Sequence, residues 1–168
     1  MIMALSASLA SAQPMVMEQD VFAGMKEYDK AVVVAVHYGS ADMDVRRDAI
    51  EKFNQRLRNE FPACDFRQAW TSSPLVRQLD AQGEVILTPV RLLDELRLEG
   101  YTHVLVQPSF LTDDVEMQHL RSQVQAAKQE FKCIRLGAPL LSSVKDYEMM
   151  ILATAAAYGE EKMGNVLV

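Results

Sequence analysis

The sequence predicts an α/β domain built on a four-stranded parallel sheet with helices on both of its faces. Four short apolar segments read as strands, at residues 31–36, 65–70, 103–108 and 133–137, and segments with helical periodicity separate them. Strands that alternate with helices form βαβ units with a parallel sheet. The runs AVVVAV and HVLVQP are nearly continuous in apolar residues. Such runs are typical of strands that are covered on both faces.

The predicted helices follow the strands in order. In the first, Val45, Ile50 and Leu57 belong to one apolar face of a 3.6-residue period, and the Phe61-Pro62 pair ends the helix. Thr88 and Pro89 are typical of the N-cap and first residue of a later helix. The full set of expected helices comprises residues 41–61, 74–79, 89–98, 113–131 and 143–158.

The chain of 168 residues is long enough for one domain with a substantial core. Residues 1–29 read as a signal-like or flexible lead-in and residues 30–168 as the α/β lobe, with 164–168 resembling the start of a further strand. Ala10-Ser11-Ala12 resembles a signal-peptide cleavage site, which favours a periplasmic location. The positive charges that usually open such a signal are missing, so a cytoplasmic location stays open.

Composition excludes two classes of protein. The chain carries 17 Lys and Arg residues against 23 Asp and Glu residues, a formal net charge of −6. Proteins that bind nucleic acid concentrate positive charge, so we do not expect nucleic acid as a partner. The apolar runs are too short to cross a bilayer as a helix, so we do not expect an integral membrane protein.

In a parallel sheet, ligands bind beyond the carboxyl ends of the strands. The first strand leads into His37, and the turn Tyr38-Gly39-Ser40 follows it. A neutral imidazole binds divalent metals or accepts a proton near pH 7, so His37 is a candidate metal ligand or base. The alternative is a buried histidine that ends a strand and is hydrogen-bonded locally. Residue type and spacing do not decide between these two interpretations.

Two further groups of residues suit a site. Glu116 and His119 lie three residues apart on a predicted helix, where both side chains point the same way and could hold one metal. Arg46 lies just after the loop that follows the first strand, and Arg67 flanks the loop that follows the second strand. Guanidinium groups suit the carboxylates of an acidic substrate. The alternative in each case is an ordinary solvated surface residue.

Four segments, in this order, resemble the anaerobic cobaltochelatases of the class II chelatase family, which insert Co²⁺ into sirohydrochlorin. The segments are VVVAVHYGSADMDVRRDAIE (32–51), FRQAWTSSPLVRQL (66–79), EGYTHVLVQPSFL (99–111) and APLLSSVKDYE (138–148). The resemblance covers residues 30–168 and corresponds to the first half of a two-lobed chain. It implies a chelatase-like (flavodoxin-like) three-layer lobe beside a cleft for a tetrapyrrole.

The resemblance also implies where catalytic histidines would lie. In the long enzymes one follows the Q-P pair, where this chain has Phe110, and another opens the second lobe. Short homodimeric members instead place a histidine in G-H-G-S after the first strand. His37-Tyr38-Gly39-Ser40 resembles that segment, with the histidine one residue early. The second histidine of the short members falls near Glu116.

The function that the resemblance implies is that of a lyase inserting a divalent metal into sirohydrochlorin or a related tetrapyrrole, in anaerobic cobalamin biosynthesis. Cobalt is the expected metal, with nickel or iron as alternatives, and it is a substrate; no permanently bound cofactor is expected. His37 and Glu116 are the expected catalytic residues, and His37, Glu116 and His119 the expected metal ligands. The expected substrate contacts are Tyr38, Gly39, Ser40, Arg46, Arg67, Trp70, Thr71, Ser72, Ser109 and Phe110.

Two alternatives to an active chelatase stay open. Phe110 at the usual histidine position favours a protein of the same fold that binds a tetrapyrrole or metal without turnover. The strand-like segment at 164–168, which stops early, and the truncated signal-like start favour a fragment of a two-lobed enzyme. A homo-oligomer, in which a second copy replaces the other lobe, is a further expectation from the short members of the family.

Overall fold

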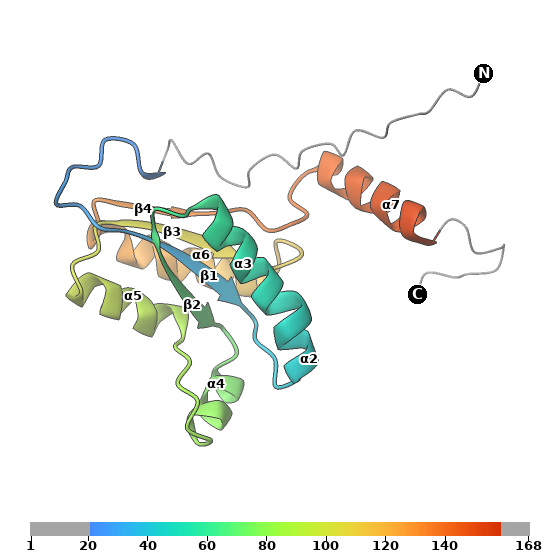
Figure 1. The fold of residues 1–168 in the computed structure, drawn as a ribbon, viewed down its shortest axis with the longest axis horizontal. Helices are drawn as coiled ribbons and strands as arrows, with labels where there is room; N and C mark the ends of the chain where they lie inside the picture. Colours follow the sequence, from blue (N-terminus) through green and yellow to red (C-terminus); the bar gives the residue numbers. More distant parts are fainter. Residues whose placement is uncertain (1–20, 159–168) are drawn as a thin grey trace.

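The computed structural model describes residues 21–158, and its core is a three-layer α/β sandwich (Figure 1). The four predicted strands are all present and run parallel, in the order β2-β1-β3-β4. The strands are β1 (Ala31–His37), β2 (Asp65–Trp70), β3 (His103–Pro108) and β4 (Cys133–Leu136). The helices are α2 (Met43–Val45), α3 (Glu51–Glu60), α4 (Ser73–Asp80), α5 (Pro89–Leu98), α6 (Val115–Ala126) and α7 (Val144–Tyr158), with a π-helical turn at Arg46–Ile50 and a 3-10 turn at Ala127–Gln129.

Alternation of side chains along β1 divides the core between the two faces of the sheet. Val32, Val34 and Val36 point to the face that α5 and α6 cover. Val33 and Ala35 point to the opposite face, where α3 packs. All five residues are buried, as the continuous apolar run of this strand predicts. The predicted α/β class, with helices on both faces, is therefore confirmed.

The first predicted helix is interrupted by the π-helical turn. The Asp42 carboxylate accepts from the backbone N–H groups of Asp44 and Val45 and caps the start of α2. The turn then follows at Arg46–Ile50, where the Glu51 N–H bonds to the Arg46 carbonyl, five residues earlier. One extra residue in a helical turn is not visible in apolar periodicity, because the apolar face resumes in α3.

Part of the predicted lead-in belongs to the packed domain. Val21 is 1% exposed and lies in the core cluster on the α3 side of the sheet, and Phe22 packs against that cluster. Asp29 pairs with Lys132, just before β4, at 2.6 Å. Residues 21–29 are therefore held against the sheet. The predictions for the signal-like start and for the further strand at 164–168 lie outside the described residues.

The remaining helices differ from prediction mainly at their ends. Thr88 is the N-cap and Pro89 the first residue of α5, as predicted. The helix predicted for 113–131 is shorter, because Asp114 caps its start and the chain tightens into a 3-10 turn after Ala126. Among the described residues, no helix is long and apolar enough to cross a membrane.

Candidate active site

The strand order places the carboxyl ends of β1 and β3 side by side at the centre of the sheet. From β1 the chain continues to its neighbour β2 at one edge of the sheet, and from β3 it continues to β4 at the other edge. Open α/β sheets bind ligands beyond the carboxyl ends of two adjacent strands, such as β1 and β3, whose connections leave in opposite directions. The Ser109 N–H donates to the Val36 carbonyl at 2.9 Å, which extends the ladder beyond β3 and holds Ser109 beside His37.

His37 is the last residue of β1, and the residue is 2% exposed. Its Nδ1 lies 2.8 Å from the Ser109 Oγ, and its Nε2 lies 2.9 Å from the Asn54 Oδ1. The ring of Phe53 packs edge-on against the imidazole, with 5.6 Å between ring centroids. The imidazole is thus enclosed by α3 on one side and the end of β3 on the other.

The hydrogen bonds assign the tautomer of His37. The Asn54 amide nitrogen donates to the Gln68 Oε1 at 3.0 Å, so the Asn54 oxygen faces the imidazole. Since a carbonyl oxygen only accepts, the His37 Nε2 carries the hydrogen. The Nδ1 of neutral His37 then accepts a hydrogen bond from the Ser109 hydroxyl. We call Ser109, His37, Asn54 and Gln68 the imidazole network.

The surroundings keep His37 neutral. Burial lowers the pKa of His37 below its ordinary value of 6.5, because a charged ring loses its hydration. The hydrogen bond to Asn54 and the negative charge of Glu51 act in the opposite direction, and burial outweighs them. Both ring nitrogens are engaged within the protein, so ligation of a metal by His37 requires that one of these hydrogen bonds break. Within the imidazole network, Ser109 is the residue at the carboxyl ends of the strands that is exposed to solvent.

The turn after β1 is fixed by the end of β2. Gly39 has φ = 102°, and a Cβ atom there would lie 2.5 Å from the Trp70 Cε3. Only glycine fits, because a side chain would strain the backbone and meet the indole. The backbone N–H groups of Thr71 and Ser72 donate to the carbonyls of His37 and Tyr38, at 2.8 and 3.2 Å. These bonds hold the two loops together at the carboxyl edge.

Several predicted substrate contacts are occupied by the protein itself. Trp70 is buried against α4, in a cluster with Val76 and Leu79, and Phe110 is buried in the core beside α6. Among the described residues, the Trp70 Nε1 and the Thr71 Oγ1 are buried without a hydrogen-bond partner. The aromatic side chain that is exposed at this edge is Tyr38.

The two arginines lie in different surroundings. The Arg46 guanidinium stacks over the Trp70 ring at 4.8 Å from its centroid, donates to Ser40 O at 2.6 Å and pairs with Glu84 at 2.7 Å. Arg46 therefore lies beside the carboxyl end of β2, and its positive charge is paired with the Glu84 carboxylate. Arg67 pairs with Glu99 at 3.4 Å and lies opposite Val34 in the middle of the sheet, away from the strand ends.

Glu116 and His119 lie in the first two turns of α6, which begins just after the β3 loop. Glu116 is partly buried and His119 is exposed. Within residues 21–158, no three side chains of the metal-ligating types His, Cys, Asp and Glu lie close enough to share one ion. The structure therefore does not bring His37, Glu116 and His119 together as a set of three ligands.

The Q-P pair at the end of β3 anchors the loop that follows β4. The buried Gln107 amide nitrogen donates to the carbonyls of Pro108 and Ala138, both at 3.1 Å. A Cβ atom at Gly137 would collide with the Gln107 side chain. The loop after β4 is thus tied to the same edge as His37 and Ser109.

Comparison with known proteins identifies the family of this chain. The sequence model of the family described as cobalt chelatase (CbiK) matches residues 30–168. The chain belongs to this family. It is 30% identical to the sirohydrochlorin cobaltochelatase of Salmonella typhimurium over 125 residues, 74% of this chain and 47% of that protein. It is also 30% identical to the sirohydrochlorin cobaltochelatase CbiKC of Nitratidesulfovibrio vulgaris over 129 residues, 76% of this chain and 45% of the relative.

The predicted family is therefore confirmed, together with its chelatase-like fold. The chain spans about half the length of the curated relatives that it matches. The roles predicted for individual site residues stay predictions.

Sequence reasoning missed Asn54, which holds the imidazole in place. The residue lies on α3 and is 1% exposed. It stands four residues after Ile50 and three before Leu57, so it belongs to the apolar face of the helix. A polar residue on that face was the available signal, because buried amides require hydrogen-bond partners.

Proposed function

We propose that this protein is a metal chelatase that inserts Co²⁺ into sirohydrochlorin or a closely related tetrapyrrole. Family membership and the names of the two relatives support the reaction class. The observation that carries the proposal in this chain is the hydrogen bond between the Ser109 hydroxyl and the neutral His37 ring. It lies at the carboxyl edge of β1 and β3, where such sheets bind ligands.

Metal insertion requires that the two pyrrole N–H protons of the ring leave as the metal enters. We assign acceptance of one of these protons to the Ser109 oxygen, and the other proton leaves to solvent water at this exposed edge. As Ser109 takes a pyrrole proton, its own hydroxyl proton passes to the His37 Nδ1, so serine remains neutral and the imidazole becomes positively charged. The negative charge of Glu51 favours that state, and the bond from Nε2 to Asn54 keeps Nδ1 facing the serine.

The entering metal is assigned to Glu116 and His119. A carboxylate and an imidazole suit divalent first-row ions, so the pair also accepts nickel or iron. Only two ligands come from this helix, which leaves the other coordination positions to water and to the tetrapyrrole nitrogens. Weak holding of this kind suits a metal that has to be handed over.

The tetrapyrrole is assigned to the surface formed by Tyr38, Ser109 and the loop that follows β2, at Thr71 and Ser72. Tyr38 supplies an exposed ring for the face of the macrocycle. Arg46 binds a peripheral carboxylate by exchanging it for Glu84, its present partner.

A second candidate function is binding of a tetrapyrrole or metal without turnover. The observation that favours it is the buried Phe110 at the position where long chelatases have histidine, together with the lack of a three-ligand cluster within residues 21–158. The two functions differ in turnover and share the same binding surface.

The test is insertion of Co²⁺ into sirohydrochlorin, followed by the change in the absorption spectrum of the macrocycle. We expect insertion above the uncatalysed rate, and a loss of about 100-fold or more in Ser109→Ala, the usual scale for a lost proton acceptor. Ser109→Thr keeps the hydroxyl and should retain most of the rate. Ser122→Ala is the matched control, because Ser122 is an exposed serine on α6 whose hydroxyl donates to the Gln118 carbonyl of the same helix.

The outcomes separate the alternatives. Tight binding of the ring with no insertion above background would favour the binding protein. Insertion that is unaffected by Ser109→Ala would leave the chelatase proposal intact and reject the proton path through Ser109.

A further inference from the structure

The three hydrogen bonds of the imidazole network all point in one direction. The Ser109 hydroxyl donates to the His37 Nδ1 at 2.8 Å, and the His37 Nε2–H donates to the Asn54 Oδ1 at 2.9 Å. The Asn54 amide nitrogen donates in turn to the Gln68 Oε1 at 3.0 Å. Hydrogen bonds in such a chain polarise one another. The chain begins at the exposed Ser109 and ends at Gln68, which is also exposed.

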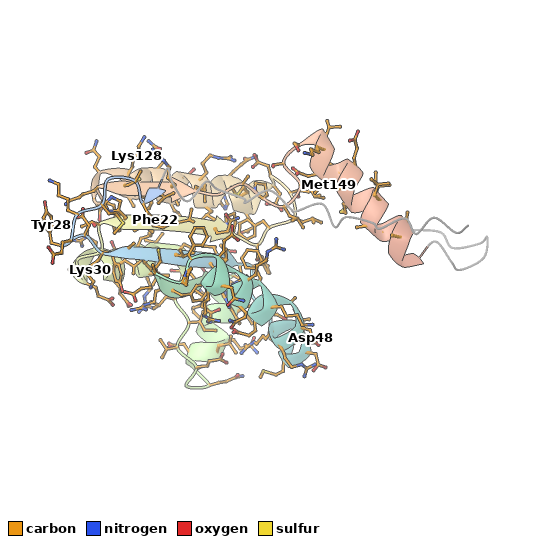
Figure 2. All side chains as sticks on the ribbon, turned by 45° about the horizontal axis from the view of Figure 1, so that its top comes forward. Phe22, Tyr28, Lys30, Asp48, Lys128 and Met149 are labelled. Atoms are coloured by element: carbon orange, nitrogen blue, oxygen red, sulfur yellow. The ribbon has the colours of Figure 1, made fainter. Side chains whose placement is uncertain are left out.

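The surrounding protein fixes the position of the imidazole ring. Phe53 and Asn54 are consecutive residues of α3, and both contact the ring, Phe53 edge-on with 5.6 Å between centroids. Figure 2 shows Asp48, in the π-helical turn, past the end of β1, and α3 runs back from there over the sheet. The Thr71 N–H donates to the His37 carbonyl at 2.8 Å. The two ring nitrogens therefore keep their places, and only the hydrogen on the ring can move between them.

The inner members of the network can form the same contacts in the opposite direction. A hydroxyl rotates, a neutral imidazole carries its hydrogen on either nitrogen, and an amide turned by 180° exchanges its oxygen and nitrogen. In the reversed chain, Asn54 donates to the His37 Nε2, and the His37 Nδ1–H donates to the Ser109 oxygen. These three residues therefore do not fix the direction by themselves. The residue at the end of the chain fixes it, by offering Asn54 either an acceptor or a donor.

We infer that Gln68 is a positioning residue, whose side-chain oxygen sets the direction of the whole network and thereby holds the ring hydrogen of His37 on Nε2. Gln68 lies on β2 opposite Ala35 and lines a hollow of about 380 Å³ at the outer edge of the sheet. Two side chains, those of Asn54 and His37, stand between Gln68 and Ser109. Gln68 therefore acts on the site through these residues and does not touch the substrate.

The direction of the network has a consequence for proton transfer, which rests on the proposed function. With the ring hydrogen on Nε2, the His37 Nδ1 can take the Ser109 hydroxyl proton as the serine oxygen receives a proton from the macrocycle. In the reversed chain Nδ1 already carries a hydrogen, so Ser109 has no acceptor for its own proton. An acceptor at residue 68 is therefore a condition for transfer from Ser109 to His37.

The test is nitrogen-15 NMR of the histidine rings in the full chain, with substitutions of Gln68. In a neutral imidazole the nitrogen that carries the hydrogen and the one that does not resonate far apart, so the spectrum reports the tautomer. The sequence has three histidines, and the signals absent from His37→Phe are those of His37. Spectra at about pH 8 observe the neutral ring.

The substitutions differ in the hydrogen bond that residue 68 offers. The wild-type chain and Gln68→Glu, whose carboxylate only accepts, should carry the His37 hydrogen on Nε2. Gln68→Lys, whose ammonium only donates, should move it to Nδ1, and Gln68→Met, of similar length, should give a mixture of both tautomers. Gln125→Lys is the matched control, because it makes the same change of charge at an exposed glutamine on α6, on the opposite face of the sheet. Its spectrum should be that of the wild type.

The kinetics of Co²⁺ insertion provide a second measurement. Gln68→Lys should lower kcat by about tenfold or more and leave KM for the macrocycle unchanged, because the variant affects proton transfer and not binding. Gln68→Glu should retain most of the rate. The near-ultraviolet circular dichroism of the buried Trp70 should be the same in all variants, since Gln68 is exposed.

Two outcomes would overturn the inference. A hydrogen that stays on Nε2 in both Gln68→Lys and Gln68→Met would show that the tautomer is set elsewhere, because neither variant has the amide oxygen. An equal change in Gln125→Lys would assign the effect to charge alone.

The proposed function fails separately from this inference. A tautomer that moves in Gln68→Lys while kcat stays unchanged would support the role of Gln68 in setting the ring hydrogen and reject the proton path through His37. A wild-type chain that inserts no metal would reject the chelatase proposal and leave the NMR result standing.

Discussion

Replacement of Asn54 by leucine tests whether the imidazole network stabilises the fold. Leucine fills roughly the same volume, so the main change is that the buried His37 Nε2–H loses its acceptor. A buried donor without a partner costs about 1–3 kcal/mol. Leucine is the better helix former by about 0.5 kcal/mol, which offsets part of the loss. Gln68, the other partner of Asn54, is exposed and can bond to water. We therefore expect a net loss of about 0.5–2.5 kcal/mol in the free energy of unfolding.

The assay is urea unfolding, followed by the fluorescence of Trp70, which is the single tryptophan of the sequence and is 2% exposed. A double-mutant cycle with His37→Phe isolates the hydrogen bond. In the His37→Phe background the Nε2–H is absent, so Asn54→Leu should cost far less, with a coupling energy of about 1 kcal/mol or more. The reasoning would be refuted by a loss below about 0.5 kcal/mol, or by the same loss in both backgrounds.

Two further predictions concern pH and the first turn. Burial lowers the pKa of His37 in the folded state, so the unfolded chain takes up a proton first as pH falls. The free energy of unfolding should therefore decline from pH 6.5 down to the folded-state pKa of His37. Above pH 6.5 this group should not affect the free energy of unfolding. His37→Phe should flatten that segment of the stability curve, and an unchanged slope would assign it to other groups. Gly39→Ala should destabilise by about 2–4 kcal/mol in the same unfolding assay, from backbone strain and contact with Trp70. Gly83→Ala, at φ = 85° with open space around the Cβ position, is its control and should lose only about 1–2 kcal/mol; equal losses would exclude a role for the indole.

The sequence was sufficient to predict the sheet, because an apolar run such as AVVVAV has few alternatives to a buried parallel strand. It was also sufficient to place His37 and Ser109 at the same edge, since both follow strands of one parallel sheet. The partners of His37 could not be predicted, because Asn54 reaches it from a helix whose rotation depends on the π-helical turn at Arg46–Ile50. The pairing of Arg46 with Glu84 could not be predicted either, since the two residues are 38 positions apart.

The burial of Trp70 illustrates a different kind of error. An aromatic residue at the end of a strand suits a flat ligand, and composition alone cannot tell such a residue from one that packs beneath a glycine. Gly39 allows the turn to pack directly against the indole, so the Trp70 side chain is covered by the protein and does not face a ligand.

His37 and Ser109 are 72 positions apart in the sequence, and their hydrogen bond depends on the pairing of β1 with β3. During synthesis, β1 and α3 emerge long before β3 is available. A nascent chain therefore carries His37 with only one of its two partners, and the ring stays open to water until β3 docks. The Ser109–His37 hydrogen bond therefore requires that β3 has paired with β1, so any ligand that depends on this bond binds only chains in which these two central strands have paired.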